Sequence, residues 1–426
     1  MLATQELIRE AALPRRLEEA LPAWLRDVPL YRRPESPPVG PESPFSLADL
    51  RRLPIITKRD IRTDFPRNFL RANVELEDLL DRELVELEHT SGTSEARTPL
   101  LLGQGWWAEQ EARALRLNPL VTEVLDRFPQ ARRVTINSPV CSGDVRYTGT
   151  PSRADRIVGN ALFVSLTRLP FLWGEADLAR MANEALEWQP QFLDVDPVYG
   201  ALFALYCERQ AIRLPSLRFI ICSYEYVSQV HRRILERAFG VPVLNLYGST
   251  ETGHLLMEAE DGEMRPSFET AFMEVLDPDE RGVGELAVTT LTNDYMPLIR
   301  YRIGDLVEWH HEPYHTTCQV HGRVADAFTG SDGKRVTTWD VDRCVAAVPG
   351  IAHYQLSERS PGDWLLRFAP DNAPPSAAQT QGLREQLGQL LGLPQGPAIQ
   401  QVELFMPEQS GKFRLGCPLK QKPLHD

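Results

Sequence analysis

The sequence predicts an α/β protein with a large N-terminal α/β domain, mixed sheets and a small C-terminal α+β domain. Strand-like and helix-like segments alternate between residues 132 and 248, which is typical of parallel strands connected by helices. After residue 265 the pattern changes to strands separated by turns rich in Gly, Asp and Pro. From about residue 327 strands and helices mix again in a shorter stretch. With 426 residues, the chain has room for two or three domains of about 150 residues each.

The first part of the chain predicts short helices and one strand. Residues 1–45 combine helical patterns with prolines and end in "RRPESPPVGPESPF", which disfavours regular structure. Two short helices follow, because Ser46 and the aspartate three residues later have the spacing of a capping box, and Thr57 precedes "KRDI" as an N-cap. "ELVELEHT" has the character of a strand. A helical pattern then covers 106–128, with a break at Pro119.

The central part has the rhythm of a parallel sheet. Its strand-like segments are "RRVTINS", "LRFIICS" and "VPVLNLYG". Its helical segments are "GEADLARMANEALEWQP", "DPVYGALFALYCERQAI" and "SQVHRRILERAFG", the last of which is closed by Gly240. Such folds bind ligands beyond the carboxyl ends of their parallel strands.

Composition excludes several functional classes. Lys and Arg total 46 against 59 Asp and Glu, a formal net charge of -13, so a general nucleic-acid binder is not expected. No stretch approaches the ~18 apolar residues of a membrane span, and the charged N-terminus lacks the apolar segment of a signal peptide. The six cysteines form no CxxC pair, which favours free thiols in a reducing cytoplasm. We therefore expect a cytoplasmic protein with neither nucleic acid nor membrane as a partner.

The stretch "LEHTSGTSEARTPLLL" contains a loop that could hold a phosphate. Five consecutive residues after the predicted strand place hydroxyl groups around a glycine: Thr90, Ser91, Gly92, Thr93 and Ser94. Backbone N–H groups at such a position converge on anions. The GxxxxGK[ST] pattern of a P-loop is absent, so a Walker-type site is not supported. The plain alternative is a turn rich in Ser and Thr.

A second candidate lies in "NLYGSTETG", where a predicted strand ends. Tyr247 offers a flat ring for a base, and Gly248 lets the backbone approach a ligand closely. Thr250 supplies a hydroxyl, and Glu251 supplies a hard oxygen ligand for Mg²⁺. The plain alternative is a strand-to-turn junction with a surface glutamate.

Three further motifs follow towards the C-terminus. In "MPLIRYRIGDL" Asp305 follows a glycine and could accept hydrogen bonds from both hydroxyls of a ribose. "HGRVADAF" places Arg323 at the proposed domain junction, and "PEQSGKFRLGCPL" places Lys412 in a glycine-flanked turn. Asp305 has the alternative of a turn at a strand edge, and Lys412 that of a solvated turn.

The segment "HHEPYHTTCQVHGR" raises the alternative of a zinc site. Its candidate ligands are His310, His311, His315, Cys318 and His321. Their spacing matches no closed Cys/His site, so we do not expect zinc here.

The order of these motifs resembles the adenylate-forming superfamily. A hydroxyl-rich loop, YGxTE, RYRxGD, GR and a late GK occur in sequence, and five ordered motifs are hard to obtain by chance. The phenylacetate–coenzyme A ligase branch is the most similar, because "GVGELAVTTL" precedes "MPLIRYRIGDL", and "LPIITKRDIR" and "SYEYVSQVHRRILERAFG", with Glu225, also resemble its segments. The resemblance covers roughly residues 50–420. It implies a large ATP- and acid-binding domain over 1–323 and a small mobile domain over 324–426.

The resemblance implies an AMP-forming ligase. Such enzymes join a carboxylic acid to the α-phosphate of ATP, release pyrophosphate and pass the acyl group to a nucleophile. Because an anion must attack a polyanion, the site must supply phosphate donors, Mg²⁺ and a cation near the α-phosphorus. Coenzyme A is the expected acceptor, with an acyl carrier protein or an amine as alternatives.

The resemblance also implies roles for individual residues. Lys412 would bridge the carboxylate and the α-phosphate, while Glu251, with Thr250, would lie at the metal and the α-phosphate. Asp305 would bind the ribose, with Arg323 beside it. The remaining residues would hold the outer phosphates or flank the adenine: Thr90, Ser91, Gly92, Thr93, Ser94, Ser223, Tyr224, Glu225, Tyr247, Gly248 and Ser249.

The chain departs from the family pattern at three places. The family's loop continues with Thr-Gly-Lys, where this chain has Ser-Glu-Ala-Arg ending at Arg97, so we expect a slower or differently posed phosphate grip. The hinge position is Ala325, which implies a different pivot for domain rotation. Glu95 and Ala325 together leave open a pseudoenzyme that binds nucleotide without turnover. Some members hold a structural metal where this chain offers only His254, so no such metal is expected.

The acid is expected to bind among "NALFVSLTRLPFLWG" and "FLDVDPVYG". Phe163, Phe171, Trp173 and Tyr199 could line a slot the size of an aromatic ring. For any one of them, a place in the core is the favoured alternative. An aromatic acid therefore follows from the family resemblance and not from these residues.

Overall fold

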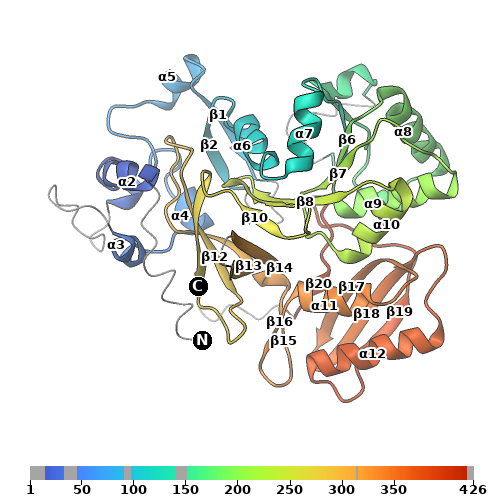
Figure 1. The fold of residues 1–426 in the computed structure, drawn as a ribbon. Coiled ribbons are helices and arrows are strands. Elements are labelled where there is room, and N and C mark those ends of the chain that lie inside the picture. Colours follow the sequence, from blue (N-terminus) through green and yellow to red (C-terminus); the bar gives the residue numbers. More distant parts are fainter. Residues whose placement is uncertain (1–14, 33–45, 91–96, 140–150, 313–314, 420–426) are drawn as a thin grey trace. The chain divides into compact units, whose positions relative to one another are not determined.

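The computed structural model describes residues 15–32, 46–90, 97–139, 151–312 and 315–419, and Figure 1 shows its elements. The chain forms two compact units: residues 1–118 with 247–319, and residues 119–246 with 320–426. Strands β8 (Val243–Ser249) and β14 (His315–Arg323) each run from one unit into the other. The predicted domain boundary after Arg323 stays a prediction.

The first unit combines short helices with antiparallel strands. Its helices are α2 (Arg15–Asp27), η1 (Pro29–Tyr31), α3 (Leu47–Arg52), α4 (Lys58–Arg62), α5 (Leu76–Asp81) and α6 (Trp106–Leu115). Its strands are the hairpin β1 (Val85–His89) and β2 (Pro99–Gly103), followed by β9 (Gly253–Glu258), β10 (Met264–Pro266), β11 (Ala271–Leu276), β12 (Gly284–Thr290) and β13 (Tyr301–Glu312). Strands β11, β12 and β13 pair antiparallel, which confirms the change of pattern predicted after residue 265.

Local sequence explains where these short helices begin. The capping box predicted at Ser46 is present, since Ser46 N donates to Asp49 Oδ2 over 3.0 Å and Asp49 N returns a bond of 3.2 Å to Ser46 Oγ. A second box at Thr57 begins α4. Because α4 is only 5 residues long, packing must hold it, and Ile61 is fully buried in the apolar core of this unit.

The second unit contains the predicted parallel strands. They are β3 (Arg133–Ile136), β5 (Ala161–Phe163), β6 (Phe192–Val195), β7 (Phe219–Cys222) and the start of β8, with β4 (Ile157–Val158) antiparallel at the edge. The helices of this part are α7 (Pro119–Arg127), η2 (Ala154–Arg156), η3 (Pro170–Leu172), α8 (Glu175–Trp188), α9 (Pro197–Arg209) and α10 (Gln229–Phe239). Two predicted helix boundaries are confirmed: α7 begins at Pro119, and Gly240 ends α10 with a φ of +67°.

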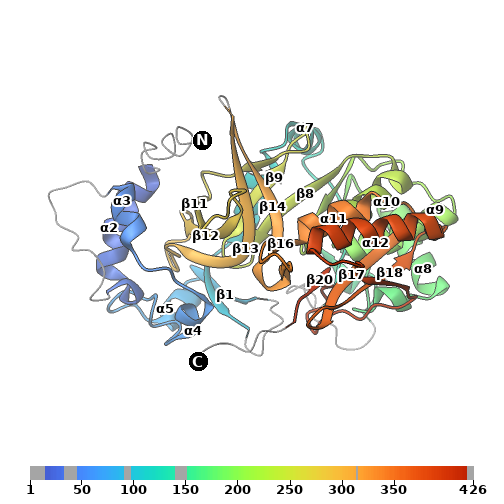
Figure 2. The same cartoon turned by 90° about the horizontal axis from the view of Figure 1, so that it is seen from below.

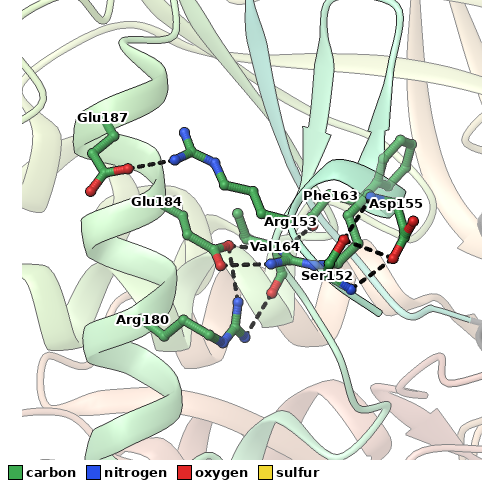
Figure 3. A network of polar contacts seen from close by, with 9 residues as sticks. Ser152, Arg153, Asp155, Phe163, Val164, Arg180, Glu184 and Glu187 are labelled. Carbon is green, nitrogen blue, oxygen red and sulfur yellow. Dashed lines mark hydrogen bonds and ion pairs between the residues drawn. The ribbon is translucent and has the colours of Figure 1, made fainter. Parts of the chain in front are cut away.

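A partly buried ion network ties β5 to α8 (Figure 3). Arg156 donates to Glu184 at 2.6 and 2.8 Å and to Phe163 O at 2.7 Å. Arg180 bonds the same carboxylate at 3.0 Å and Val164 O at 3.0 Å. Although burial raises the pKa of Glu184, its two arginine partners hold that pKa below its usual value. The end of β5 is therefore fixed by charge-assisted bonds as well as by packing.

The C-terminal part of the second unit is a small α+β layer. Its sheet has the order β19-β18-β17-β20, made of β17 (Ile351–Ser360), β18 (Asp363–Pro370), β19 (Ala398–Gln401) and β20 (Gly416–Cys417). Helices α11 (Thr338–Ala346) and α12 (Ala377–Leu391) lie side by side against this sheet in Figure 2, and η4 (Val324–Asp326), β15 (Phe328–Thr329) and β16 (Arg335–Val336) precede them. Ser376 and Gln379 form the capping box that starts α12.

The predicted fold class is confirmed. Twelve strands are hydrogen-bonded in the order β11-β12-β13-β14-β10-β9-β8-β7-β6-β3-β5-β4, in addition to the small C-terminal sheet. In the described part of the chain, every helix is too short or too polar to cross a membrane.

Candidate active site

Lys412 lies in a tight turn, residues 408–413, which we name the lysine turn. Glu408 N donates to Lys412 O over 2.8 Å, and Gly411 N donates to Glu408 O over 2.9 Å. Gly411 has a φ of +86°, and a Cβ there would collide with Ser138 Oγ just after β3. Only glycine therefore fits both the turn and the strand end beneath it.

The loop after β7 contacts the lysine turn through two short hydrogen bonds. Lys412 Nζ donates to Tyr224 O over 2.7 Å, and Phe413 N donates to Glu225 Oε1 over 2.7 Å. Tyr224 has a φ of +76°, which is uncommon for an aromatic residue. Its hydroxyl donates to Asp194 Oδ2 over 2.9 Å. The carbonyl and the hydroxyl of Tyr224 are thus both hydrogen-bonded, which holds the uncommon backbone conformation. The structure thus brings Lys412, Tyr224 and Glu225 together.

Two carboxyl groups lie beneath the lysine turn. Asp196 follows β6, is 1% exposed and caps α9 by accepting from Val198 N at 2.9 Å and Tyr199 N at 3.3 Å. It also shares a side-chain hydrogen bond with Glu225. Burial raises the pKa of Asp196 to about 7, although its hydrogen bonds and Lys412 oppose the shift. Burial, followed by repulsion from Asp196, raises the pKa of Glu225 well above its usual value.

Ser223 lies one residue after β7, near the base of this cluster. Its hydroxyl donates to Asp194 Oδ1 over 3.1 Å, and both residues are buried. Asp194 therefore binds both Ser223 and Tyr224. The roles predicted for Ser223, Tyr224 and Glu225 around adenine stay predictions.

The predicted acyl-pocket residues occupy tightly packed positions in the second unit. Phe163, Trp173 and Tyr199 are 9%, 9% and 0% exposed. The Tyr199 hydroxyl lies 3.0 Å from Gly411 O and 2.9 Å from Arg168 O. Phe171 packs its ring 5.5 Å from that of Phe413. Tyr199 and Phe171 therefore contact the lysine turn, and a pocket role for the four residues stays a prediction.

Glu251 is the centre of a polar cluster in the first unit. Its Oε1 accepts from the Tyr301 hydroxyl at 3.0 Å and lies 3.1 Å from Lys58 Nζ. Burial raises the pKa of this carboxyl, but the charge of Lys58 and hydrogen bonds outweigh burial and hold that pKa below its usual value. Burial and the Glu251 charge in turn raise the pKa of Tyr301, so the phenol stays a donor. An ionised carboxylate is the ligand type that Mg²⁺ prefers, so this residue fits the implied metal.

The residues next to Glu251 in "NLYGSTETG" make separate side-chain contacts within the first unit. Tyr247 donates to Asp305 Oδ2 over 2.7 Å, which joins two of the predicted nucleotide-binding residues. Ser249 Oγ lies 3.0 Å from Thr252 Oγ1, and Thr250 beside it is half-buried. A Cβ at Gly248 would collide with Gly253 O, so packing alone requires glycine here.

The hydroxyl-rich loop is described only at its base. Thr90 N donates to Thr98 O over 3.0 Å, and Thr98 N donates to Thr90 Oγ1 over 3.1 Å. These bonds close the β1–β2 hairpin around the loop. Ser91, Gly92, Thr93, Ser94 and Glu95 lie outside the described residues.

Arg323 ends β14 and is exposed. The predicted hinge follows it directly: the Ala325 carbonyl accepts from Arg414 Nη2 at 2.6 Å, and Asp326 Oδ1 accepts from Arg414 Nε at 2.7 Å. The hinge position is therefore held by a residue two places after Lys412.

The histidines around β13 and β14 have separate surroundings. His321 is buried with Nδ1 3.1 Å from Thr337 Oγ1, whereas His310 lies 3.8 Å from Glu308. Burial raises the pKa of the Cys318 thiol. Among the residues that the structure describes, no three His, Cys, Asp or Glu side chains gather as metal ligands.

Sequence reasoning missed three residues of these clusters: Lys58, Tyr301 and Asp196. Lys58 stands in "LPIITKRDIR", whose only signal is its likeness to a family segment, and Tyr301 stands in "MPLIRYRIGDL" three residues before a glycine. Asp196 precedes a proline at the start of a predicted helix, so a capping role was its visible signal.

Known proteins resemble the chain in sequence and in fold. Phenylacetate-coenzyme A ligase from Escherichia coli (strain K12) is 27% identical over 315 residues, 70% of this chain and 66% of that protein. The ligase of the same name from Thermus thermophilus is 26% identical over 358 residues, 79% of this chain and 75% of its own length. No family model matches the chain.

The fold is shared with a solved ligase. The structure of 2-hydroxyisobutyryl-CoA ligase in the postadenylation state, in complex with R3-HIB-AMP, has a TM-score of 0.67 and 19% identity. The likeness covers 96% of this chain and 88% of that one. The chain is a homologue of the phenylacetate–coenzyme A ligases. It shares the fold of that solved ligase, and the predicted resemblance to the phenylacetate–coenzyme A ligase branch is confirmed in sequence.

Proposed function

We propose that this phenylacetate–coenzyme A ligase homologue activates a carboxylic acid with ATP and transfers the acyl group to a thiol, with coenzyme A as the acceptor. The observation that carries the proposal is the lysine turn. In a homologue of such ligases, Lys412 is held by Tyr224 O at the carboxyl end of a parallel strand, which is where an α/β fold binds its ligand.

The proposed reaction has two steps. An oxygen of the carboxylate attacks the α-phosphorus of ATP, and pyrophosphate leaves with the electron pair of the broken P–O bond. The sulfur of the acceptor thiol, which gives up its proton to solvent, then attacks the acyl carbon, and AMP leaves with the electron pair of the broken C–O bond. The first step brings negative charges together, so a fixed cation such as Lys412 stabilises its transition state more than its ground state.

The first unit supplies the proposed nucleotide ligands. Glu251 would hold Mg²⁺, which when bound neutralises charge on the phosphates. Asp305 would bind the ribose hydroxyls, with its carboxylate oriented by Tyr247. Lys58 adds a cation 3.1 Å from Glu251, so we also propose it as a phosphate contact missed by the motif pattern. The remaining predicted ligands keep their proposed roles: Thr90 to Ser94 at the phosphates, and in the second unit Arg323 beside the ribose and Ser223, Tyr224 and Glu225 beside the adenine.

The proposed identities of the acid and of the acceptor are based on the relatives of this chain. An aromatic acid is proposed because of the phenylacetate–coenzyme A ligase relatives. An acyl carrier protein or an amine remains an alternative acceptor.

Pyrophosphate exchange tests the proposal. The protein is incubated with ATP, Mg²⁺, labelled pyrophosphate and a panel of aryl and fatty acids. Acid-dependent label in ATP is expected for at least one aromatic acid, and adding coenzyme A or a carrier protein then identifies the acceptor by the mass of its product. ATP binding without exchange for any acid would favour the pseudoenzyme that Glu95 and Ala325 leave open.

A further inference from the structure

Asp196 and Glu225 form a pair of carboxyl groups to which the proposed reaction assigns no chemistry. Each follows a parallel strand of the second unit, β6 or β7. They are joined by a side-chain hydrogen bond, and Glu225 continues the chain of contacts to Phe413 N at 2.7 Å. Phe413 is the residue next to Lys412. The pair is therefore connected to the proposed catalytic lysine through a backbone bond and not through substrate.

The protonation of the pair follows from its surroundings. Two carboxylates in contact and away from water cannot both ionise without a large cost, so such pairs retain one proton. The groups that face them are Lys412 and Arg323, both cationic. Asp196 has a pKa of about 7, and its charge raises the pKa of Glu225 further, so Glu225 keeps its proton after Asp196 has ionised. The pair then carries a single negative charge, which Lys412 balances.

We propose that Asp196 and Glu225 are positioning residues that fix the lysine turn for the first step of the reaction. Glu225 accepts from Phe413 N, and Lys412 is left to donate to Tyr224 O and to substrate. The proton that Glu225 keeps limits the pair to a single negative charge, so no second charge draws the Lys412 ammonium away from the phosphate. This inference rests on the proposed function and adds the alignment of its central cation.

Two substitutions at Glu225 separate the functions of its carboxyl group. Glu225→Gln keeps an oxygen acceptor for Phe413 N but cannot ionise. Glu225→Ala removes the acceptor. Glu236→Gln is the matched control, because Glu236 lies on α10, is 49% exposed and pairs with Arg232 at its surface.

Pyrophosphate exchange at pH 6 and pH 8 is the activity measurement. Glu225→Ala should lower the maximal rate by roughly tenfold or more, a larger change than in KM for ATP, because the orientation of Lys412 is lost. Glu225→Gln should restore most of the rate at both pH values, because its amide oxygen still accepts from Phe413 N and its amide NH2 replaces the proton shared with Asp196. Glu236→Gln should match wild type throughout.

Hydrogen exchange of the Phe413 amide is a readout that does not depend on activity. It is expected to be protected in the wild type and in Glu225→Gln, and at least tenfold faster in Glu225→Ala. If no acid supports exchange of pyrophosphate, the proposed function fails while the amide still tests the positioning. An unprotected Phe413 amide in the wild type, or a maximal rate in Glu225→Ala equal to that of the wild type, would overturn the inference.

Discussion

The carboxyl groups of Glu251 and Glu225 lie in the two compact units of the chain, and their surroundings differ in the charges that they supply. Glu251 is buried beside Lys58 and a phenol donor, and its pKa lies below the usual value. Glu225 is in contact with a second carboxyl, and burial raises its pKa well above the usual value. Burial acts in the same direction on both groups, so the nearest charge decides which of them is ionised.

The difference indicates different uses. A carboxylate that stays ionised can bind a cation such as Mg²⁺. A carboxyl that shares a proton can donate and accept hydrogen bonds but adds little negative charge where an anion must bind. The proposed metal ligand and the proposed positioning group thus have the protonation states that their tasks require.

Removing the cation of the second unit is expected to have the largest effect. Lys412→Ala should lower acid-dependent pyrophosphate exchange by about 10²–10³-fold, since a preorganised charge at the α-phosphorus is lost. ATP affinity, measured by calorimetry, should change little. Lys334→Ala is the control, because Lys334 is 78% exposed and pairs with Asp332 in a turn. Normal exchange in Lys412→Ala would refute its role.

Neutralising the ionised carboxylate of the first unit should have the next largest effect. Glu251→Gln is expected to lower the exchange rate by about 10²-fold and to raise the Mg²⁺ concentration needed for half-maximal rate. Glu274→Gln is the control, because Glu274 is also a buried carboxylate, paired with Arg300 at 3.0 Å. That variant should lose stability with its Mg²⁺ dependence unchanged. An unaltered Mg²⁺ dependence in Glu251→Gln would contradict the metal role.

The two carboxyl regions should also give stability opposite pH dependences. The raised pKa of Asp196 means that its contribution is fully present below about pH 4 and is lost as pH rises to about 7, by at most ~1.4 kcal/mol per pH unit. The lowered pKa of Glu251 has the reverse sign, so its contribution is lost as pH falls through that pKa.

Asp196→Asn tests the first half of this statement. Asparagine still caps α9. The urea midpoint of the variant, relative to that of the wild type, should therefore be higher at pH 8 than at pH 5. Urea denaturation at both values measures the difference. A difference that is equal at pH 5 and pH 8 would show that Asp196 ionises normally.

The smallest effect is expected where a carboxylate only loses an orienting partner. Tyr247→Phe removes the 2.7 Å bond to Asp305 but leaves the carboxylate. Because one hydrogen bond contributes about 1 kcal/mol, KM for ATP should rise roughly two- to tenfold. Steady-state kinetics with varied ATP measures it, and a fall in maximal rate at unchanged KM would argue against ribose binding by Asp305.

The sequence predicted the fold better than it predicted the contacts of the site. Parallel strands, capped helices and the late antiparallel strands follow from local patterns, and these are confirmed. Glu251 and Asp305 were singled out by motif, but the Tyr301 partner of Glu251 lies 50 residues further along the chain. Such pairings depend on strand register and on packing between distant segments, which a local pattern does not contain.

Tyr199 is a second residue whose contacts a local sequence pattern cannot predict. As an aromatic residue near a predicted strand end, it could line a pocket or fill a core. Its hydroxyl position at Gly411 O depends on where the lysine turn lies. No pattern within either segment gives that distance.

Helix α10 has a consequence for shortened versions of the chain. Val230 is fully buried in the apolar core of the C-terminal layer, Ser228 donates to Asp342, and His231 Nε2 lies 3.0 Å from His353 Nδ1. A fragment ending at Arg323 would expose that valine and leave a buried imidazole without its acceptor or donor. Such a fragment should therefore aggregate or be degraded when expressed alone, and reconstitution of activity from separately produced halves should require that they fold together.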